Sequence, residues 1–205
     1  MEHWDTRMVQ LSRGARPSES GDLAKDKKLP NLEQQFLEVG GETLTFVTQE
    51  LMDRRLSMKL PRNFQEMSEE MARIKYPSDR RPQLIFTNET GTVNLAFTHT
   101  ASPVEKAEVG QFTEVMTASL RKAQKLRKWH GSGMLDTDET TVGYCEFVSP
   151  TLEEDIYNLM GFLSMEERAL LCTFNCLGDD MKEWQPMAHA MMRSIRLAED
   201  EEQSG

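Results

Sequence analysis

The stretch that decides the fold of this chain is Leu56-Ser-Met-Lys-Leu-Pro61, followed by Arg81-Pro-Gln-Leu-Ile-Phe-Thr-Asn-Glu-Thr-Gly-Thr-Val-Asn-Leu-Ala-Phe97. Leu56, Met58 and Leu60 alternate with polar residues, and this period of two is typical of a half-buried strand. Pro61 has no amide to donate to a sheet, so it ends the strand. The later stretch contains two strand-like runs, residues 83–87 and 93–98, around a turn that ends in glycine, which predicts a hairpin.

The residues around this stretch predict a second hairpin and a short helix. Gly40 and Gly41 separate two strand-like runs, and glycine readily adopts the positive φ that both turn positions need. Ser68 precedes two glutamates, a pattern that favours the start of a helix. Pro77 then ends this helix, because the residue before a proline disfavours the helical conformation.

The second half of the chain predicts two long helices and three strands. Residues 103–128 carry apolar side chains at steps of three and four, the period of an amphipathic helix. Residues 131–133, Gly-Ser-Gly, are then interpreted as the glycine turn that ends it. Residues 141–148, 155–164 and 168–176 predict strands, and the last is apolar on both faces, which indicates a central position. Residues 181–196 predict a closing helix.

These elements predict one α+β domain. Hairpin connections imply an antiparallel sheet, here of about six or seven strands, and the amphipathic helices must cover it as an α/β/α sandwich. We expect a flexible N-terminal arm over residues 1–30, the domain over 31–197, and an acidic flexible tail over 198–205.

Charge and cysteine content limit the function classes. The chain has 205 residues and a formal net charge of −10, which disfavours nucleic acid and anionic membrane surfaces as partners. No run approaches the roughly 20 apolar residues of a membrane span, and residues 1–30 lack the apolar centre of a signal peptide. The three cysteines do not form a disulfide pattern and are interpreted as buried. We therefore expect a cytosolic protein.

The segment 56–64, the hairpin after it, the long middle helix and the closing segment 187–196 together resemble the Mog1/PsbP-like fold. Within that fold they resemble most the DcrB-like group of bacterial proteins, over residues 37–197. The resemblance implies an antiparallel sheet between helices. It also implies a role other than catalysis, because members bind a GTPase, dock onto a membrane photosystem, or act as accessory factors and effector chaperones. No motif matches closely enough to carry functional residues over.

No pattern in the chain predicts catalysis, a cofactor or a metal site. The four histidines stand at no ligand spacing from one another or from a cysteine: His3, His99, His130 and His189. The acidic loop with Asp136, Asp138 and Glu139 lacks the glycine and spacing of a calcium loop, so a solvated turn is favoured. We predict no cofactor.

The best candidate for a partner-binding surface is the loop 75–82, which two prolines restrict. It presents Lys75, Tyr76, Arg80 and Arg81, and tyrosine and arginine are favoured anchors at interfaces. A stiff loop also loses little entropy on binding. The alternative is a rigid turn between a helix and a strand. The basic run at 121–128 has two interpretations as well, a patch for an acidic partner or a complement to the negative helix end.

Three functions remain open. The first is a non-catalytic cytosolic accessory protein that binds another protein through loops and a sheet face. The second is a chaperone-like binder of apolar client segments, because the 14 methionines could line an adaptable groove, although core filling explains them too. The third is a small enzyme with a dispersed active site.

Overall fold

The computed structural model describes residues 29–78, 81–135, 137 and 139–198. Almost all of the predicted N-terminal arm and acidic tail lie outside the described residues. The same is true of Arg80 in the candidate loop, and of Asp136 and Asp138 in the acidic loop. The predictions for these parts therefore stay predictions.

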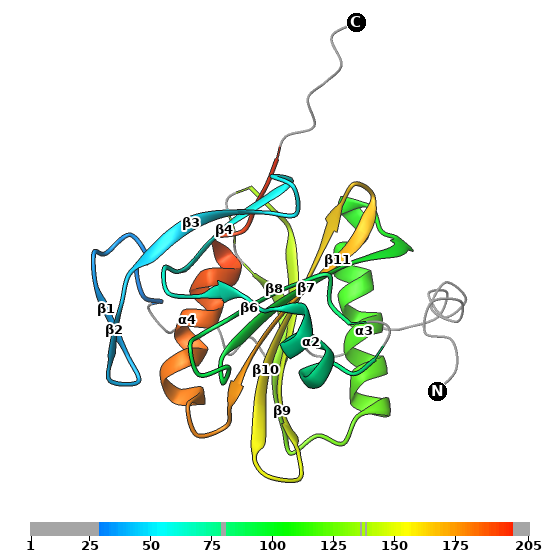
Figure 1. The fold of residues 1–205 in the computed structure, drawn as a ribbon. Helices are drawn as coiled ribbons and strands as arrows, with labels where there is room; N and C mark the ends of the chain where they lie inside the picture. Colours follow the sequence, from blue (N-terminus) through cyan, green and yellow to red (C-terminus); the bar gives the residue numbers. More distant parts are fainter. Residues whose placement is uncertain (1–28, 79–80, 136, 138, 199–205) are drawn as a thin grey trace, which may run out of the picture.

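A seven-stranded sheet forms the centre of the molecule (Figure 1). In spatial order its strands are β5 (Gln65–Glu66), β6 (Leu84–Thr87), β7 (Asn94–Pro103), β11 (Arg168–Leu177), β10 (Asp155–Met165), β9 (Val142–Pro150) and β8 (Lys128–Leu135). Every neighbouring pair is antiparallel. The predicted α+β class and the central position of residues 168–176 are confirmed.

Helices cover both faces of this sheet. The helix α4 (Met181–Arg193) lies on one face. The other face carries α3 (Val109–Ala123), which follows the short 3-10 turn η1 (Lys106–Glu108), and α2 (Glu69–Lys75). Strand β10 shows how its side chains alternate between the layers. Leu159 belongs to the same core cluster as Met191 of α4, whereas Phe162 belongs to the cluster of Met116 on α3.

Two small sheets complete the fold. A hairpin of β1 (Leu37–Val39) and β2 (Glu42–Leu44) turns at Gly40 and Gly41, which both have positive φ as predicted. A three-stranded sheet follows in the order β12 (Arg196–Leu197), β4 (Leu56–Pro61) and β3 (Phe46–Leu51). The alternating residues of β4 are at most 1% exposed, so this strand fastens the small sheet onto the core.

The end of the middle helix differs from the sequence prediction. The helix α3 ends at Ala123, because Gln124 has an extended backbone. Residues 128–135 then form the edge strand β8 rather than a helix end and a turn, so the interpretation of the glycine stretch was wrong. Gly131 lies at an irregularity in the pairing with β9 and has a φ of 151°, a backbone conformation that other residues rarely adopt.

The short helix and its caps follow the prediction. The hydroxyl of Ser68 accepts a hydrogen bond from the amide of Met71 and caps α2. Tyr76 is the C-cap and lies outside the helical region, as expected of a residue before Pro77. The end of α2 therefore fixes where the candidate loop begins.

Candidate functional site

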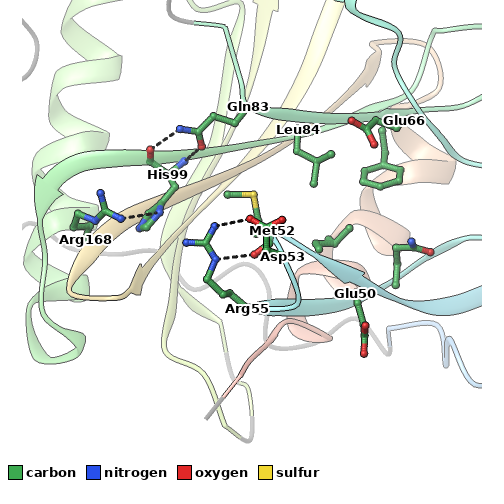
Figure 2. Close-up of a pocket in the computed structure, with 12 residues that line it drawn as sticks. Glu50, Met52, Asp53, Arg55, Glu66, Gln83, Leu84, His99 and Arg168 are labelled. Atoms are coloured by element: carbon green, nitrogen blue, oxygen red, sulfur yellow. Dashed lines mark hydrogen bonds and ion pairs between the residues drawn. The ribbon is translucent and has the colours of Figure 1, made fainter. Parts of the chain in front are cut away.

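A groove of about 630 Å³ lies between the small sheet and the edge of the large sheet (Figure 2). Strand β3 and the turn after it supply one wall. The other wall comes from β5, from β6 and from Gln83 just before it, and His99 and Arg168 lie at one end. Leu84 and Phe86 add apolar surface to a lining that is otherwise mainly polar or charged.

The turn between β3 and β4 has an unusual backbone. Met52, Asp53 and Arg54 are three consecutive residues with left-handed φ values of 54°, 58° and 68°. Such a conformation costs a residue other than glycine roughly 1–2 kcal/mol, and backbone strain of this kind is concentrated at functional sites. Arg55 supports the turn, because its Nε donates to the carbonyl of Met52 at 2.7 Å.

An ion cluster closes one end of the groove. Arg55 Nη1 contacts the two carboxylate oxygens of Glu166 at 3.2 and 3.1 Å, and Arg168 Nη2 contacts the same carboxylate at 3.4 Å. The hydrogen bond from Arg55 is the main cause that lowers the pKa of Glu166. The cluster therefore joins the β3–β4 turn to the β10–β11 turn.

His99 lies at the same end and uses both ring nitrogens. Its Nε2 lies 2.9 Å from the carbonyl of Met165, and because a carbonyl can only accept, Nε2 carries the proton. Its Nδ1 then accepts from Arg168 at 3.4 Å. The side chain of Gln83 also holds the main chain of His99 through two hydrogen bonds, of 3.0 and 2.8 Å. This histidine is therefore a structural link with no nitrogen left to act as a base.

The opposite end of the groove is acidic. Glu50 of β3 and Glu66 of β5 lie away from His99 and Arg168 (Figure 2). Glu50 pairs with Arg54 at 3.0 Å on the surface. No cation contacts Glu66 within the described ranges. The groove thus has a basic end, which its own carboxylates neutralise, and an acidic end that retains a free carboxylate.

The candidate loop begins in firm contact with the sheet. The ammonium group of Lys75 donates to the carbonyl of Gly91 and, at 3.2 Å, to Asn94 Oδ1, and burial lowers its pKa. Burial raises the pKa of Tyr76, although a hydrogen bond with Asn175 acts the other way. Arg81 is half-buried. The structure thus ties the start of the loop to the fold, and the role of the loop in partner binding stays a prediction.

A second polar cluster lies inside the molecule, between α4 and the sheet. Glu146 Oε2 and His189 Nε2 are 3.1 Å apart, and the amide of Gln185 donates to the other carboxylate oxygen. Burial alone would raise the pKa of Glu146, but the hydrogen bonds and charge of its partners bring it below the ordinary value. Glu146 and His189 are only 5% and 7% exposed, so the pair lacks access to a substrate.

The buried hydroxyl of Tyr157 lies near this pair and interacts with Glu146. Its pKa is raised, first by burial and then by the charge of Glu146. His130 on β8 has a lowered pKa, again mainly because of burial. Burial therefore favours the neutral form of both side chains.

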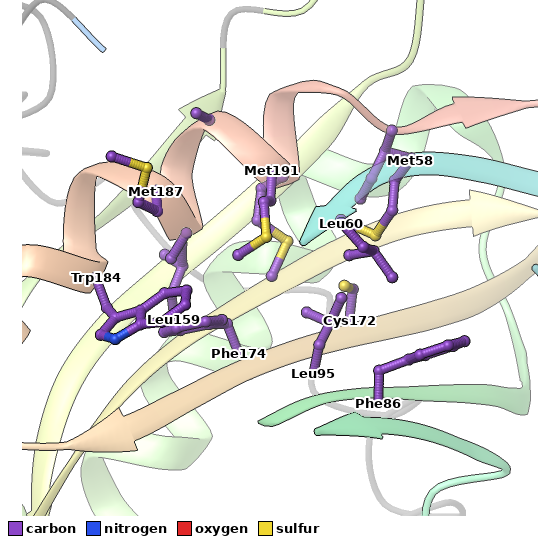
Figure 3. Packing of buried hydrophobic residues seen from close by; sticks show 14 of the residues in the cluster. Met58, Leu60, Phe86, Leu95, Leu159, Cys172, Phe174, Trp184, Met187 and Met191 are labelled. Carbon is purple, nitrogen blue, oxygen red and sulfur yellow. The ribbon is translucent and has the colours of Figure 1, made fainter. Parts of the chain in front are cut away.

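The sulfur-containing residues mainly fill the core (Figure 3). Met58 and Met191 are fully buried, and Met187 is 8% exposed. The three cysteines are free and buried, and burial raises the pKa of Cys145 to about 12. A thiol with such a pKa is not a nucleophile at neutral pH.

No helix in the described part of the chain is long and apolar enough to span a membrane. Within the same residues, no three side chains of histidine, cysteine, aspartate or glutamate come together as metal ligands.

Sequence reasoning did not find the groove. Its walls come from residues between positions 49 and 168, and only the order of strands in two sheets brings these together. The sequence draws attention to His99 among them, but only as a possible metal ligand that its spacing excludes. The consecutive left-handed residues of the β3–β4 turn include no glycine, so no local signal marks that turn.

No protein-family model matches the chain, and no curated protein matches it. Solved structures do match it. Cyanobacterial PsbP (CyanoP) from Synechocystis sp. PCC 6803 aligns with a TM-score of 0.51 and 8% identity, over 75% of this chain and 92% of that chain. LpqN of Mycobacterium tuberculosis, which is involved in cell envelope biogenesis, aligns with a TM-score of 0.47 and 10% identity, over 76% and 91%. The chain has a Mog1/PsbP-like fold, as predicted, and the likeness to CyanoP bears on the fold alone.

Proposed function

We propose that this protein is a non-catalytic accessory protein that binds another protein in the groove between its two sheets and through the loops beside it. The observation that carries the proposal is the groove of about 630 Å³, which two sheet edges flank and polar and charged side chains line. Polar, partly charged surfaces around a few apolar groups are typical of transient protein interfaces.

The ionisable groups favour binding over catalysis. An active site needs a nucleophile or base aimed at a common point where a substrate can sit. In the groove, Arg55, Arg168 and His99 contact neighbouring groups of the protein instead. The pair of Glu146 and His189 is buried under α4, away from the groove.

Helix α2 offers a separate surface for a partner, on the face of the large sheet that α3 also covers. It begins three residues after Glu66 and exposes two apolar side chains, Met71 at 48% and Ile74 at 78%. Exposed apolar side chains that lie close together mark surfaces for partners. Tyr76 and Arg81 follow directly in the chain, so the predicted loop would extend this surface.

The cellular setting is part of the proposal. Three free, buried cysteines fit a reducing compartment such as a bacterial cytosol. The net charge of −10 supports a protein partner over nucleic acid or an anionic membrane.

The experiment that tests the function compares two tryptophan variants in affinity purification from native cells. Gln49 is exposed on β3 and lines the groove, so Gln49→Trp would fill the groove without burying a polar group. Glu114 is exposed on α3 at the opposite face, and Glu114→Trp is the matched control. We expect a stoichiometric partner with the wild type and the control only. Equal recovery with Gln49→Trp, or no partner together with turnover of a small metabolite, would contradict the function.

A further inference from the structure

Strand β3 is an edge of the small sheet, and no other described strand pairs with its outer side. The sheet order places β3 last, with β4 as its neighbour. Its six residues pair with β4 in one continuous register and include no proline. Proteins usually protect such edges with bulges, prolines or a covering segment, because free backbone groups attract another strand. Gln49, Glu50 and Leu51 of β3 line the groove.

The hydrogen-bond pattern shows which backbone groups are free. The carbonyl of Thr45 accepts from the amide of Arg62 at 2.8 Å. Bonded and non-bonded pairs alternate along an antiparallel ladder, so the N–H and C=O groups of Thr48 and Glu50 point away from β4. The amide of Lys59, opposite Thr48, agrees with this pattern, because it donates away from β3 to Ser194 Oγ at 2.9 Å. No backbone partner for the outward groups of Thr48 and Glu50 lies among the described residues.

The edge strand β8 of the large sheet provides a contrast. It begins with Lys128 and carries an irregularity between Trp129 and Gly131. A lysine and a bulge are both features that discourage pairing with another strand. Strand β3 has neither feature and borders a groove that can receive a chain.

The charges beside the free edge determine what kind of chain fits. Three acidic residues and two arginines line the groove, and both arginines already contact Glu166. Glu66 lines the groove and has no cationic partner among the described residues, whereas the side chain of Glu50 points away from it and pairs with Arg54 (Figure 2). A lysine or arginine next to Glu66 would therefore be attracted, and an acidic side chain would be repelled.

We propose that an extended, basic segment of the partner adds to β3 as a further strand of the small sheet, with a lysine or arginine next to Glu66. This inference rests on the proposed function and specifies the chemistry of the partner. Strand addition draws its affinity from main-chain hydrogen bonds and its specificity from alternate side chains. The edge of β3 accommodates about 20 Å of extended chain, or roughly six residues.

The test uses a phage-displayed library of random heptapeptides, selected on the full-length protein. Thr48→Pro removes one outward amide, and proline is tolerated where the amide of an edge strand faces outward. Thr48→Val keeps that amide and is the matched control. We expect enriched peptides to carry lysine or arginine and to bind Thr48→Val like the wild type. Binding to Thr48→Pro should be about tenfold weaker, because a main-chain hydrogen bond is lost and its acceptor is left unpaired.

A second measurement does not depend on the proline variant. Amide hydrogen exchange of the wild type should slow at Thr48 and Glu50 when an enriched peptide is added, and Glu66→Gln should weaken that peptide. Enrichment of no peptide, or of peptides that leave the exchange at both amides unchanged, would overturn the inference. A wild-type dimer that Thr48→Pro converts to a monomer would also overturn it, because a second copy of this chain would then occupy the edge.

The two proposals fail in different ways. If Gln49→Trp abolishes the native partner while Thr48→Pro does not, the groove binds a protein but not as an added strand. If neither variant affects the partner, the groove is not the binding site and the proposed function fails with the inference.

Discussion

Arg55 Nη1 lies 3.1 and 3.2 Å from the two carboxylate oxygens of Glu166, and this contact joins the small sheet to the large sheet. The two residues belong to turns that are 111 positions apart in the chain. The backbone of Glu166 also has a left-handed conformation, with a φ of 51°. The contact fixes one end of the groove, and Glu66 lies toward the other end (Figure 2).

Replacement of this arginine should change the titration of its partner. In Arg55→Gln the pKa of Glu166 should rise toward the ordinary value of 4.5, because the hydrogen bond from Arg55 is the main cause that lowers it. The interaction stabilises the fold above pH 4.5, and this contribution is lost as the pH falls through the lowered pKa. NMR titration of the Glu166 carboxyl group measures the effect, and Arg54→Gln is the control. An unchanged pKa in Arg55→Gln would show that the contact is absent in solution.

The buried pair under α4 should contribute much more to stability than an exposed carboxylate. Glu146→Ala leaves His189 and Gln185 without their acceptor, so we expect a loss of about 3 kcal/mol in the free energy of unfolding. The exposed residue Glu114 should tolerate the same change within about 0.5 kcal/mol. Urea unfolding followed by tryptophan fluorescence gives both values. Equal losses for the two variants would disprove the buried pair.

The pH dependence of stability should include a contribution from His130. Burial lowers the pKa of its imidazole below the ordinary value of 6.5, so between those two pKa values the unfolded chain binds more protons than the folded chain. The free energy of unfolding should therefore fall as the pH drops from 6.5 toward the lowered pKa. The slope in this range should be smaller in His130→Gln than in the wild type. Urea titrations at several pH values test this, and identical slopes would count against it.

Two glycine-to-alanine changes should have opposite effects. A Cβ at Gly143 of β9 would lie 2.8 Å from Thr113 Cβ on α3, whereas a Cβ at Gly110 of α3 meets no atom within 4 Å. Gly143→Ala should therefore destabilise the protein by about 1–3 kcal/mol through overpacking. Gly110→Ala should stabilise it by roughly 0.5–1 kcal/mol, because alanine favours the helix. Thermal unfolding compares the two variants, and a stable Gly143→Ala would show that α3 packs less closely than described.

The elements that the sequence predicted correctly have a recognisable pattern within their own residues. Strand β4 alternates buried and partly exposed side chains, and the turn at Gly40 and Gly41 has the positive φ that glycine allows. Strand β11 is apolar on both faces, which reflects the helices on either side of the sheet. Each of these signals lies in the residues of the element itself, so the sequence alone reveals it.

The elements that were missed depend on partners far away in the chain. Strand β8 has two glycines and no regular alternation, and its pairing with β9 holds it in the sheet. Trp129, which the sequence placed just after a helix, stacks on Phe147 of β9 with ring centroids 6.0 Å apart. The groove likewise exists only because the sheet order brings β3 opposite β5 and β6. A local pattern contains no information about either pairing.

Site-specific photocrosslinking in native cells tests the central claim most directly, namely that the groove binds a protein. A photoreactive phenylalanine derivative would replace Gln49 on β3 in one variant and Glu114 on α3 in the other. We predict one discrete crosslinked protein from position 49, joined through an extended segment rich in lysine or arginine, and none from position 114. Equal crosslinking from both positions, or none from position 49, would contradict the account.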